Sequence, residues 1–370
     1  MSSKKRYAAV DHARGMAVVL MVLVHTLWIY GSDYTQTESF FGHFVHFVGR
    51  GTPMFLVAMG FSFILSSRQS FTSSALRGVI LLAAGFVMNA LKFLVPYAFG
   101  FLPASFLAAY GWEAPLTGEQ LLYLLATGDI LQLAGLSLIL MGAIRAVTDR
   151  VDLTMAAAVV VAIAGGWLRG LRPGIPGLDY AADLLWGAEW NVYFPVFPWA
   201  AVIIFGMALG RAQTKAEDDT VVFRRMFPLG LVLALVGGAL CYYDPEFHIN
   251  DFFHLGPGGA IHLMGIGALL MWLSHVMTNA LSHRFGWRQL CVLLKHASRR
   301  VTTLYVIQWV MICWGMAIIG YKTLSPLQVA LLFPVILVLC LAIDEGARRA
   351  IQALRSPKPL VPPAPKKAKA

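Results

Sequence analysis

Two ionisable side chains in the first apolar segment share one face of a helix. Arg14 and His25 lie eleven residues apart in YAAVDHARGMAVVLMVLVHTLWIYG, a rotation of about 20° after whole turns and about 16 Å along a helix axis. Asp11 precedes Arg14 by three residues, so the two could form an ion pair. Because histidine exchanges protons near neutral pH, the stripe could supply a general base. The alternative is structural: Arg14 ends the span, and His25 lies at the opposite interface beside Trp28.

A second polar stripe occurs in FFGHFVHFVGRGTPMFLVAMGFSFIL. His43, His46 and Arg50 lie at positions i, i+3 and i+7, within about 60° of one another on a helix. A charged side chain costs several kcal/mol in hydrocarbon, so this face should point into the bundle or a water-filled cavity. We expect it to face His25 across such a cavity, with Asp129 as the anionic partner of Arg50. His43 taken alone is explained as well by an interfacial position.

The elements that would position these residues are membrane-spanning helices. The chain has 370 residues, of which 58% are hydrophobic and 13% charged, whereas soluble domains have about a quarter of their residues charged. The composition predicts an all-α, polytopic membrane bundle of ten or eleven helices, and 97–112 could add a short re-entrant piece. Ten apolar runs approach the roughly 20 residues that a spanning helix needs: 9–31, 41–66, 76–96, 121–146, 153–170, 193–212, 226–243, 258–281, 301–320 and 325–346.

Basic residues fix the expected orientation. Of the 29 Lys and Arg residues, all but five fall in the N-terminal segment, the C-terminal segment or the loops on the same side. By the positive-inside rule, both termini should be cytoplasmic. We expect one transmembrane domain over 1–350 and a disordered, basic, Pro/Lys/Ala-rich cytoplasmic tail over 351–370. The chain should be a multi-pass protein of the cell (inner or plasma) membrane, and its net charge of +10 reflects topology rather than nucleic-acid binding.

Other polar residues give weaker signals. Asn89 and Lys92 lie one turn apart and could line the same cavity, although the lysine could also snorkel outward. The segment YYDPEFHINDFFHLGPGGAIH is rich in Asp, Glu and His, but its spacing matches no firm zinc pattern. We therefore predict no metal site. The four cysteines show no C-x-x-C spacing and are best explained as apolar filler.

Several of these motifs resemble a known family. RYAAVDHARGMAVVLMVLVH is similar to the first helix of the transmembrane acyltransferase superfamily, which pairs an arginine with a histidine after ten intervening residues. GTPMFLVAMGFSFILSSR resembles its second helix. TGDILQLAGLSL and YFPVFPWAAVIIFGMALGR resemble one branch, the bacterial relatives of heparan-α-glucosaminide N-acetyltransferase. The resemblance covers most of residues 6–212.

The resemblance implies acyl transfer across the membrane. The donor in the family is cytoplasmic acyl-CoA, commonly acetyl-CoA, and the acceptor is a hydroxyl or amine of a sugar on the far side. His25 takes the position of the essential histidine and Arg14 that of its partner, with Asp11 at the preceding acidic position. The heparan enzyme has its histidine before the second helix, so His43 and His46 remain alternatives for the base.

These positions suggest a mechanism. The CoA phosphates would meet arginines at the cytoplasmic face, namely Arg14, Arg68, Arg77 and Arg211. The thioester would reach a histidine in the outer half, and Arg50 or Gln308 would stabilise the developing oxyanion. Other residues expected to line the substrate cavity are Asn89, Asp129, Gln132, Trp199 and Gln308. No cofactor is expected to be bound permanently, and a homodimer is compatible with the sequence. A proton-coupled transporter or flippase, or a non-catalytic scaffold, would use similar residues.

Overall fold

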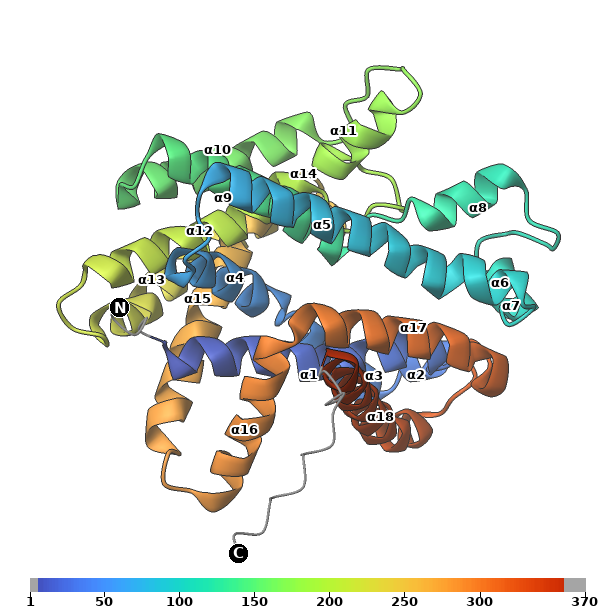
Figure 1. Ribbon diagram of the computed structural model, residues 1–370. Helices are drawn as coiled ribbons and strands as arrows, with labels where there is room; N and C mark the ends of the chain where they lie inside the picture. The colour runs from blue at the N-terminus through green and yellow to red at the C-terminus, as the bar shows by residue number, and fades with distance from the viewer. Residues whose placement is uncertain (1–5, 356–370) are drawn as a thin grey trace, which may run out of the picture.

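A computed structural model describes residues 6–355 of the chain and contains helices, turns and two isolated bridges over that range. Figure 1 shows α1, α5, α12 and α17 running roughly along one axis, while α15 and α16 form a hairpin that projects from this group. In chain order the helices are α1 (Ala8–Tyr30), α2 (Asp33–Thr37), α3 (Phe40–Gly49), α4 (Thr52–Leu65), α5 (Phe71–Asn89), the π-helix η1 (Ala90–Leu94), α6 (Val95–Ala98), α7 (Ala104–Ala108), α8 (Gly118–Leu125), α9 (Ile130–Val147), α10 (Val151–Leu168), α11 (Leu178–Trp186), α12 (Val196–Lys215), α13 (Val221–Tyr243), α14 (Pro245–His248), α15 (Pro257–Ala280), α16 (Phe285–Arg299), α17 (Val301–Ile319) and α18 (Pro326–Arg355).

The predicted all-α membrane bundle is confirmed. Within residues 6–355, ten helical segments are long and apolar enough to cross a membrane, and each overlaps one predicted run. The segment 97–112 holds only the end of α6 and the short α7. Residues 351–355, predicted as the start of a disordered tail, are helical and form the end of α18. Residues 356–370 lie outside the described range.

The second predicted span is interrupted in its middle. α3 ends at Gly49, Arg50 is its C-cap residue, and α4 begins at Thr52 with Pro53 in its first turn. Proline lacks a backbone N–H and is tolerated at the start of a helix but not in its interior. The break places Arg50 at a helix end, where its side chain can leave the helix surface.

The third span contains a π-helical segment. α5, η1 and α6 form one continuous helical run, and the wider turn of η1 carries Lys92. Such π segments are frequent at functional sites because they redirect side chains from the α-helical face. Lys92 is 2% exposed and therefore points into the protein.

α12 forms the centre of the bundle. Every residue from 198 to 211 is buried, as expected for a helix that is apolar on all sides. A Cβ atom at Gly60 of α4 or Gly206 of α12 would collide with the backbone of the other helix. The two glycines therefore allow α4 and α12 to pack backbone to backbone.

Loops rich in basic residues meet at the end of the bundle where α1 begins. Arg211 near the end of α12 hydrogen-bonds the Thr148 carbonyl at 2.8 Å, and Arg145 of α9 hydrogen-bonds Gln69 after α4 at 3.3 Å. At the other end of α1, Lys322 pairs with Asp33 at 2.8 Å. The assignment of the basic end to the cytoplasm remains a prediction.

Candidate active site

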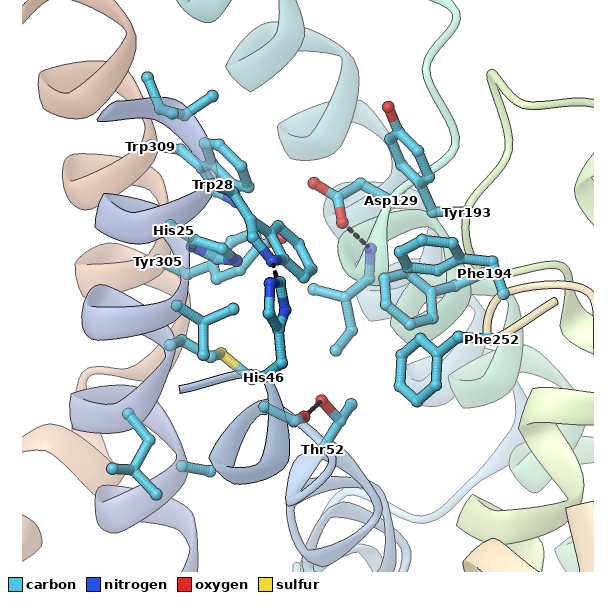
Figure 2. A pocket seen from close by; sticks show the side chains of 18 of the residues that line it. His25, Trp28, His46, Thr52, Asp129, Tyr193, Phe194, Phe252, Tyr305 and Trp309 are labelled. Carbon is cyan, nitrogen blue, oxygen red and sulfur yellow. Dashed lines mark hydrogen bonds between the residues drawn. The ribbon is translucent and has the colours of Figure 1, made fainter. Parts of the chain in front are cut away.

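A cavity of about 560 Å³ lies beside the C-terminal half of α1. Figure 2 shows His25, Trp28 and His46 on one side and Asp129, Tyr193, Phe194 and Phe252 facing them. Most of the wall is apolar or aromatic, and few polar groups converge on it, as in most small-molecule sites. The polar and aromatic side chains that line it are His25, Trp28, His46, Arg50, Thr52, Lys92, Phe93, Phe106, Tyr110, Asp129, Tyr193, Phe194, Phe252, Phe253, Tyr305, Trp309 and Tyr321.

His25 lines this cavity and is 7% exposed. Its imidazole stacks on the indole of Trp309, with ring centroids 4.0 Å apart and planes at 27°. The ring centroids of Trp28 and Tyr305 lie 5.7 Å and 5.9 Å from the centroid of this imidazole. Its Nδ1 atom is buried and has no hydrogen-bond partner among residues 6–355. Aromatic rings therefore orient the imidazole, and no described residue selects its tautomer.

His46 lies on the same side of the cavity. The indole N–H of Trp28 lies 3.5 Å from His46 Nδ1, a long contact that does not by itself fix the tautomer of the ring. His43 is exposed and does not line the cavity. The expected stripe thus contributes His46 and Arg50 but not His43.

A buried ion pair lines the same cavity and lies close to Trp309, the residue on which His25 stacks. Lys92 Nζ is 3.7 Å from Asp129 Oδ2, and the two side chains are 3% and 6% exposed. The ammonium is also 4.2 Å from the centre of a Trp309 ring and 4.7 Å from that of Phe93, within cation–π range. Asp129 therefore pairs with Lys92, and the predicted pairing of Asp129 with Arg50 is wrong. A lysine with an internal carboxylate and two rings does not need to snorkel outward.

Two of the predicted cavity residues, Asn89 and Gln132, lie outside the cavity and hydrogen-bond the backbone around Asp129. Asn89 Nδ2 donates to the carbonyls of Leu125 and Thr127 at 2.9 Å and 2.7 Å. Gln132 Oε1 accepts from the backbone N–H of Asp129 at 3.1 Å, which caps α9. Both amides are buried and absent from the cavity wall. They are positioning residues rather than substrate contacts.

Trp199 and Gln308 are also buried behind the wall. Trp199 Nε1 donates to the carbonyl of Phe253 at 2.6 Å, so it supports one aromatic residue that lines the cavity. Gln308 precedes Trp309 on α17, and both polar atoms of its side chain are buried without a hydrogen-bond partner in the described chain. Gln308 therefore does not line the cavity, contrary to the prediction.

Tyrosines in the loops complete the wall. Burial, with a smaller contribution from the Asp129 charge, raises the pKa of Tyr193 to about 12. Burial also raises the pKa of Tyr110 far above its usual range. The Tyr110 hydroxyl donates a hydrogen bond to that of Tyr193, so the Tyr193 hydroxyl is the one that can donate into the cavity.

The acidic residue at the start of α1 has a different partner from the one expected. Asp11 accepts from Arg6 at 2.5 Å and 3.0 Å and from Ser298 at 2.9 Å. No hydrogen bond or salt bridge within the described residues joins Asp11 to Arg14, so the predicted pairing is wrong. Arg14 Nε is buried and has no hydrogen-bond partner among the residues that the structure describes. By helical phase, Arg14 lies on the face of Ala17, which lines the cavity.

The other arginines expected at CoA lie at the end of the bundle where α1 begins. Arg77 donates to the carbonyl of Arg68 at 3.3 Å, and the Arg68 side chain is exposed. Arg211 is 3% exposed and hydrogen-bonds the side chain of Thr154 as well as the carbonyls of Thr148 and Arg150. Arg211 therefore holds the α9–α10 connection. Arg68 and Arg77 remain accessible.

The Asp- and His-rich segment before α15 forms a folded loop. His254 Nδ1 lies 2.9 Å from Asp251 Oδ2, and its Nε2 lies 2.9 Å from the Val192 carbonyl. Hydrogen bonds from His254 hold the pKa of Asp251 below its usual range despite partial burial. These contacts attach the loop to the segment that carries Tyr193.

Tyr305 and Trp309, which contact His25, were not predicted from the sequence. Lys92 was expected either to line the cavity with Asn89 or to snorkel outward, and the first alternative is the one observed for the lysine. Its spacing from Asn89 and the presence of Asp129 in another span were the available signals. An aromatic residue within an apolar span gives no sequence signal that it contacts a functional group.

The sequence comparisons agree with this arrangement. Residues 6–244 match the family described as heparan-alpha-glucosaminide N-acetyltransferase, catalytic. Among curated proteins, no match is found. The match covers well over half of the chain, including α1 to α13 and most of the cavity wall. The chain is therefore a multi-pass membrane protein that belongs to the transferase family of the heparan-α-glucosaminide N-acetyltransferase catalytic region.

Proposed function

We propose that this protein transfers an acyl group, most simply acetyl, from cytoplasmic acyl-CoA to a hydroxyl or amine of an extracytoplasmic glycan or glycolipid. The observation that carries the proposal is the position of His25. Its imidazole lines a cavity together with His46 and the Lys92–Asp129 pair, and neither ring nitrogen hydrogen-bonds any residue between 6 and 355. Such a ring can receive a proton from a bound acceptor.

The two histidines are given different roles in this proposal. His46, whose Nδ1 lies 3.5 Å from the indole N–H of Trp28, is proposed to donate a ring N–H to the oxyanion that forms on the acyl carbon. His25 is the general base, because no described residue fixes its tautomer. Lys92 adds positive charge on the same side as the developing oxyanion.

Direct transfer needs no acyl-enzyme. The acceptor oxygen or nitrogen forms a bond to the acyl carbon as His25 takes its proton. The carbon–sulfur bond of the thioester then breaks, and the proton passes from His25 to the CoA thiolate. Arg14, Arg68 and Arg77 are proposed to bind the CoA phosphates at the end where α1 begins.

The experiment compares cells with and without the chain. Mass spectrometry of surface glycans and lipids should show a species heavier by one acyl group only when the protein is present. The purified protein in lipid nanodiscs should release free CoA from acetyl-CoA when an extract containing that acceptor is added. Movement of a solute without release of CoA would instead support a transporter.

A further inference from the structure

A second, larger cavity adjoins the candidate active site. It has a volume of about 880 Å³ and lies between α1, α3, α13, α15 and α16. Its size is near the upper end of small-molecule sites. Six residues line both cavities: Leu20, Val48, Arg50, Gly51, Met54 and Phe252. A ligand in the second cavity could therefore extend past this shared wall towards His25.

The wall of the second cavity is almost entirely hydrocarbon. Its few polar side chains direct their hydrogen bonds into the protein. His12 Nδ1 lies 2.9 Å from Thr278 Oγ1, and His262 Nδ1 lies 2.9 Å from the Ala234 carbonyl. Ser274 donates to the carbonyl of Ala9 at 2.8 Å. The surface presented to a ligand is thus apolar along most of its length.

Arg50 is the exception, and it lies at the shared wall. It is the one Lys, Arg, Asp or Glu side chain among the residues that line the second cavity. The residue is exposed, and its guanidinium makes no hydrogen bond or ion pair with any residue between 6 and 355. A guanidinium pairs strongly with phosphate or carboxylate oxygens. The junction of the two cavities therefore offers an unpaired positive charge at one end of an apolar space.

The second cavity reaches the lipid-facing surface. Phe47 of α3 and Leu273 of α15 line it while remaining 72% and 42% exposed. Along α15 the lining extends from Gly259 to Met277, which is about 27 Å of helix axis. An elongated apolar space open to the membrane suits a hydrocarbon chain that enters sideways from the bilayer.

We propose that the second cavity binds the hydrocarbon chain of a membrane amphiphile whose phosphate group contacts Arg50. The binding site itself follows from the apolar wall, the unpaired arginine and the opening to lipid. The assignment of this amphiphile as the acyl acceptor rests on the proposed function. In that assignment the sugar attached beyond the phosphate lies in the first cavity, within reach of His25.

Photolabelling tests the binding site without requiring transfer. The probe is dodecyl phosphate with a diazirine near the end of its chain, added to the full chain in phosphatidylcholine nanodiscs. Labels should map to α1, α15 and α16 around the second cavity. Unlabelled dodecyl phosphate should protect the site from photolabelling at a concentration about tenfold lower than dodecanol requires, as expected for a charge-assisted hydrogen bond. In the Arg50→Gln variant, the two compounds should protect at nearly the same concentration.

A matched pair of variants separates the cavity from ordinary lipid contact. Leu273 and Val276 both lie on α15 with similar exposure, 42% and 38%, but only Leu273 lines the cavity. Leu273→Trp should reduce protectable labelling several-fold, and Val276→Trp should leave it unchanged. Labelling that spreads over lipid-facing residues and is not protected by dodecyl phosphate would overturn the proposed site. Equal protection by dodecanol would overturn the role of Arg50.

A second assay tests the acceptor assignment. With acetyl-CoA, dodecyl glucosaminide should be acylated with kcat/KM at least about tenfold above methyl glucosaminide. Leu273→Trp should remove this advantage and leave the methyl compound unaffected. Equal use of both compounds would overturn the amphiphilic acceptor while supporting the proposed acyltransferase. If no acceptor is acylated but photolabelling is still specific, the proposed function and the acceptor assignment would both be contradicted. The proposed binding site would still be supported.

Discussion

The imidazole of His25 on α1 stacks on the indole of Trp309 on α17, with ring centroids 4.0 Å apart. The same indole lies 4.2 Å from Lys92 Nζ. Trp309 therefore contacts both the histidine and the ion pair. Stacking orients the imidazole through its faces, and because Nδ1 is buried, Nε2 is the nitrogen left available for a substrate. A hydrogen-bonding partner would have occupied one of the ring nitrogens.

Replacement of Trp309 should affect turnover through the orientation of His25. Trp309→Phe keeps a ring against the imidazole and should retain most activity. Trp309→Ala should lower kcat about 10- to 100-fold, because a misplaced base loses the advantage of fixed geometry. Release of CoA from acetyl-CoA by protein in nanodiscs measures this effect. Equal activity of the Phe and Ala variants would show that stacking has no role in positioning.

The two cavity histidines should respond differently to glutamine. His25→Gln removes the base and should lower transfer about 10²- to 10⁴-fold, while the fluorescence-detected elution profile of the folded protein stays unchanged. His46→Gln keeps an N–H donor and should cost about tenfold or less. His43→Gln is the matched control, since His43 is exposed outside the cavity. A larger loss at His46 than at His25 would reverse the two roles.

Breaking the buried ion pair should cost stability. Lys92→Met leaves the Asp129 carboxylate buried without its cation, which should destabilise the protein by about 3–5 kcal/mol. Unfolding of the purified protein in detergent, followed by tryptophan fluorescence, measures the loss.

The double variant separates stability from activity. Lys92→Met with Asp129→Asn removes both charges, and asparagine still caps a helix well. It should recover most of the stability but little of the transfer activity. Full release of CoA by this double variant would limit the pair to a structural role.

The stability that Tyr193 contributes should be lost at alkaline pH. Its pKa is raised by burial to about 12, whereas an unfolded tyrosine titrates near 10. The stabilising contribution is fully present below about pH 10 and is lost as the pH rises towards 12, because the unfolded chain releases its proton first. Tyr193→Phe should therefore lose less stability between pH 9 and pH 11 than the parent. An identical loss would place the Tyr193 hydroxyl in contact with solvent.

Sequence was enough for the spans and for part of the site. Hydropathy identified the ten spanning segments because the bilayer fixes the length and composition of a crossing helix. Helical phase placed His25 and His46 on surfaces that line a cavity, but His43 is exposed outside it, and Arg50 is an exposed residue at the helix break that borders the cavity. Helical phase could not detect the break at Arg50, although Gly51 and Pro53 were visible beside it.

Partner choice depended on the tertiary structure. Asp11 pairs with Arg6 rather than Arg14, and Asp129 pairs with Lys92 rather than Arg50. The first is a choice among neighbours in sequence, and the second joins helices 37 residues apart in the chain, counted from Lys92 to Asp129. The second pairing depends on how the helices cross and on the π-helical turn that carries Lys92.

The sequence by itself determined that this is a membrane bundle with histidines and arginines on inward faces, because lipid excludes exposed charge. The tertiary structure decided which of these groups meet. Packing of α1 against α17 places His25 on Trp309, and the break between α3 and α4 leaves Arg50 unpaired at the border of two cavities. Side-chain contacts between distant helices depend on their relative rotation and tilt, and these are set by the whole core at once.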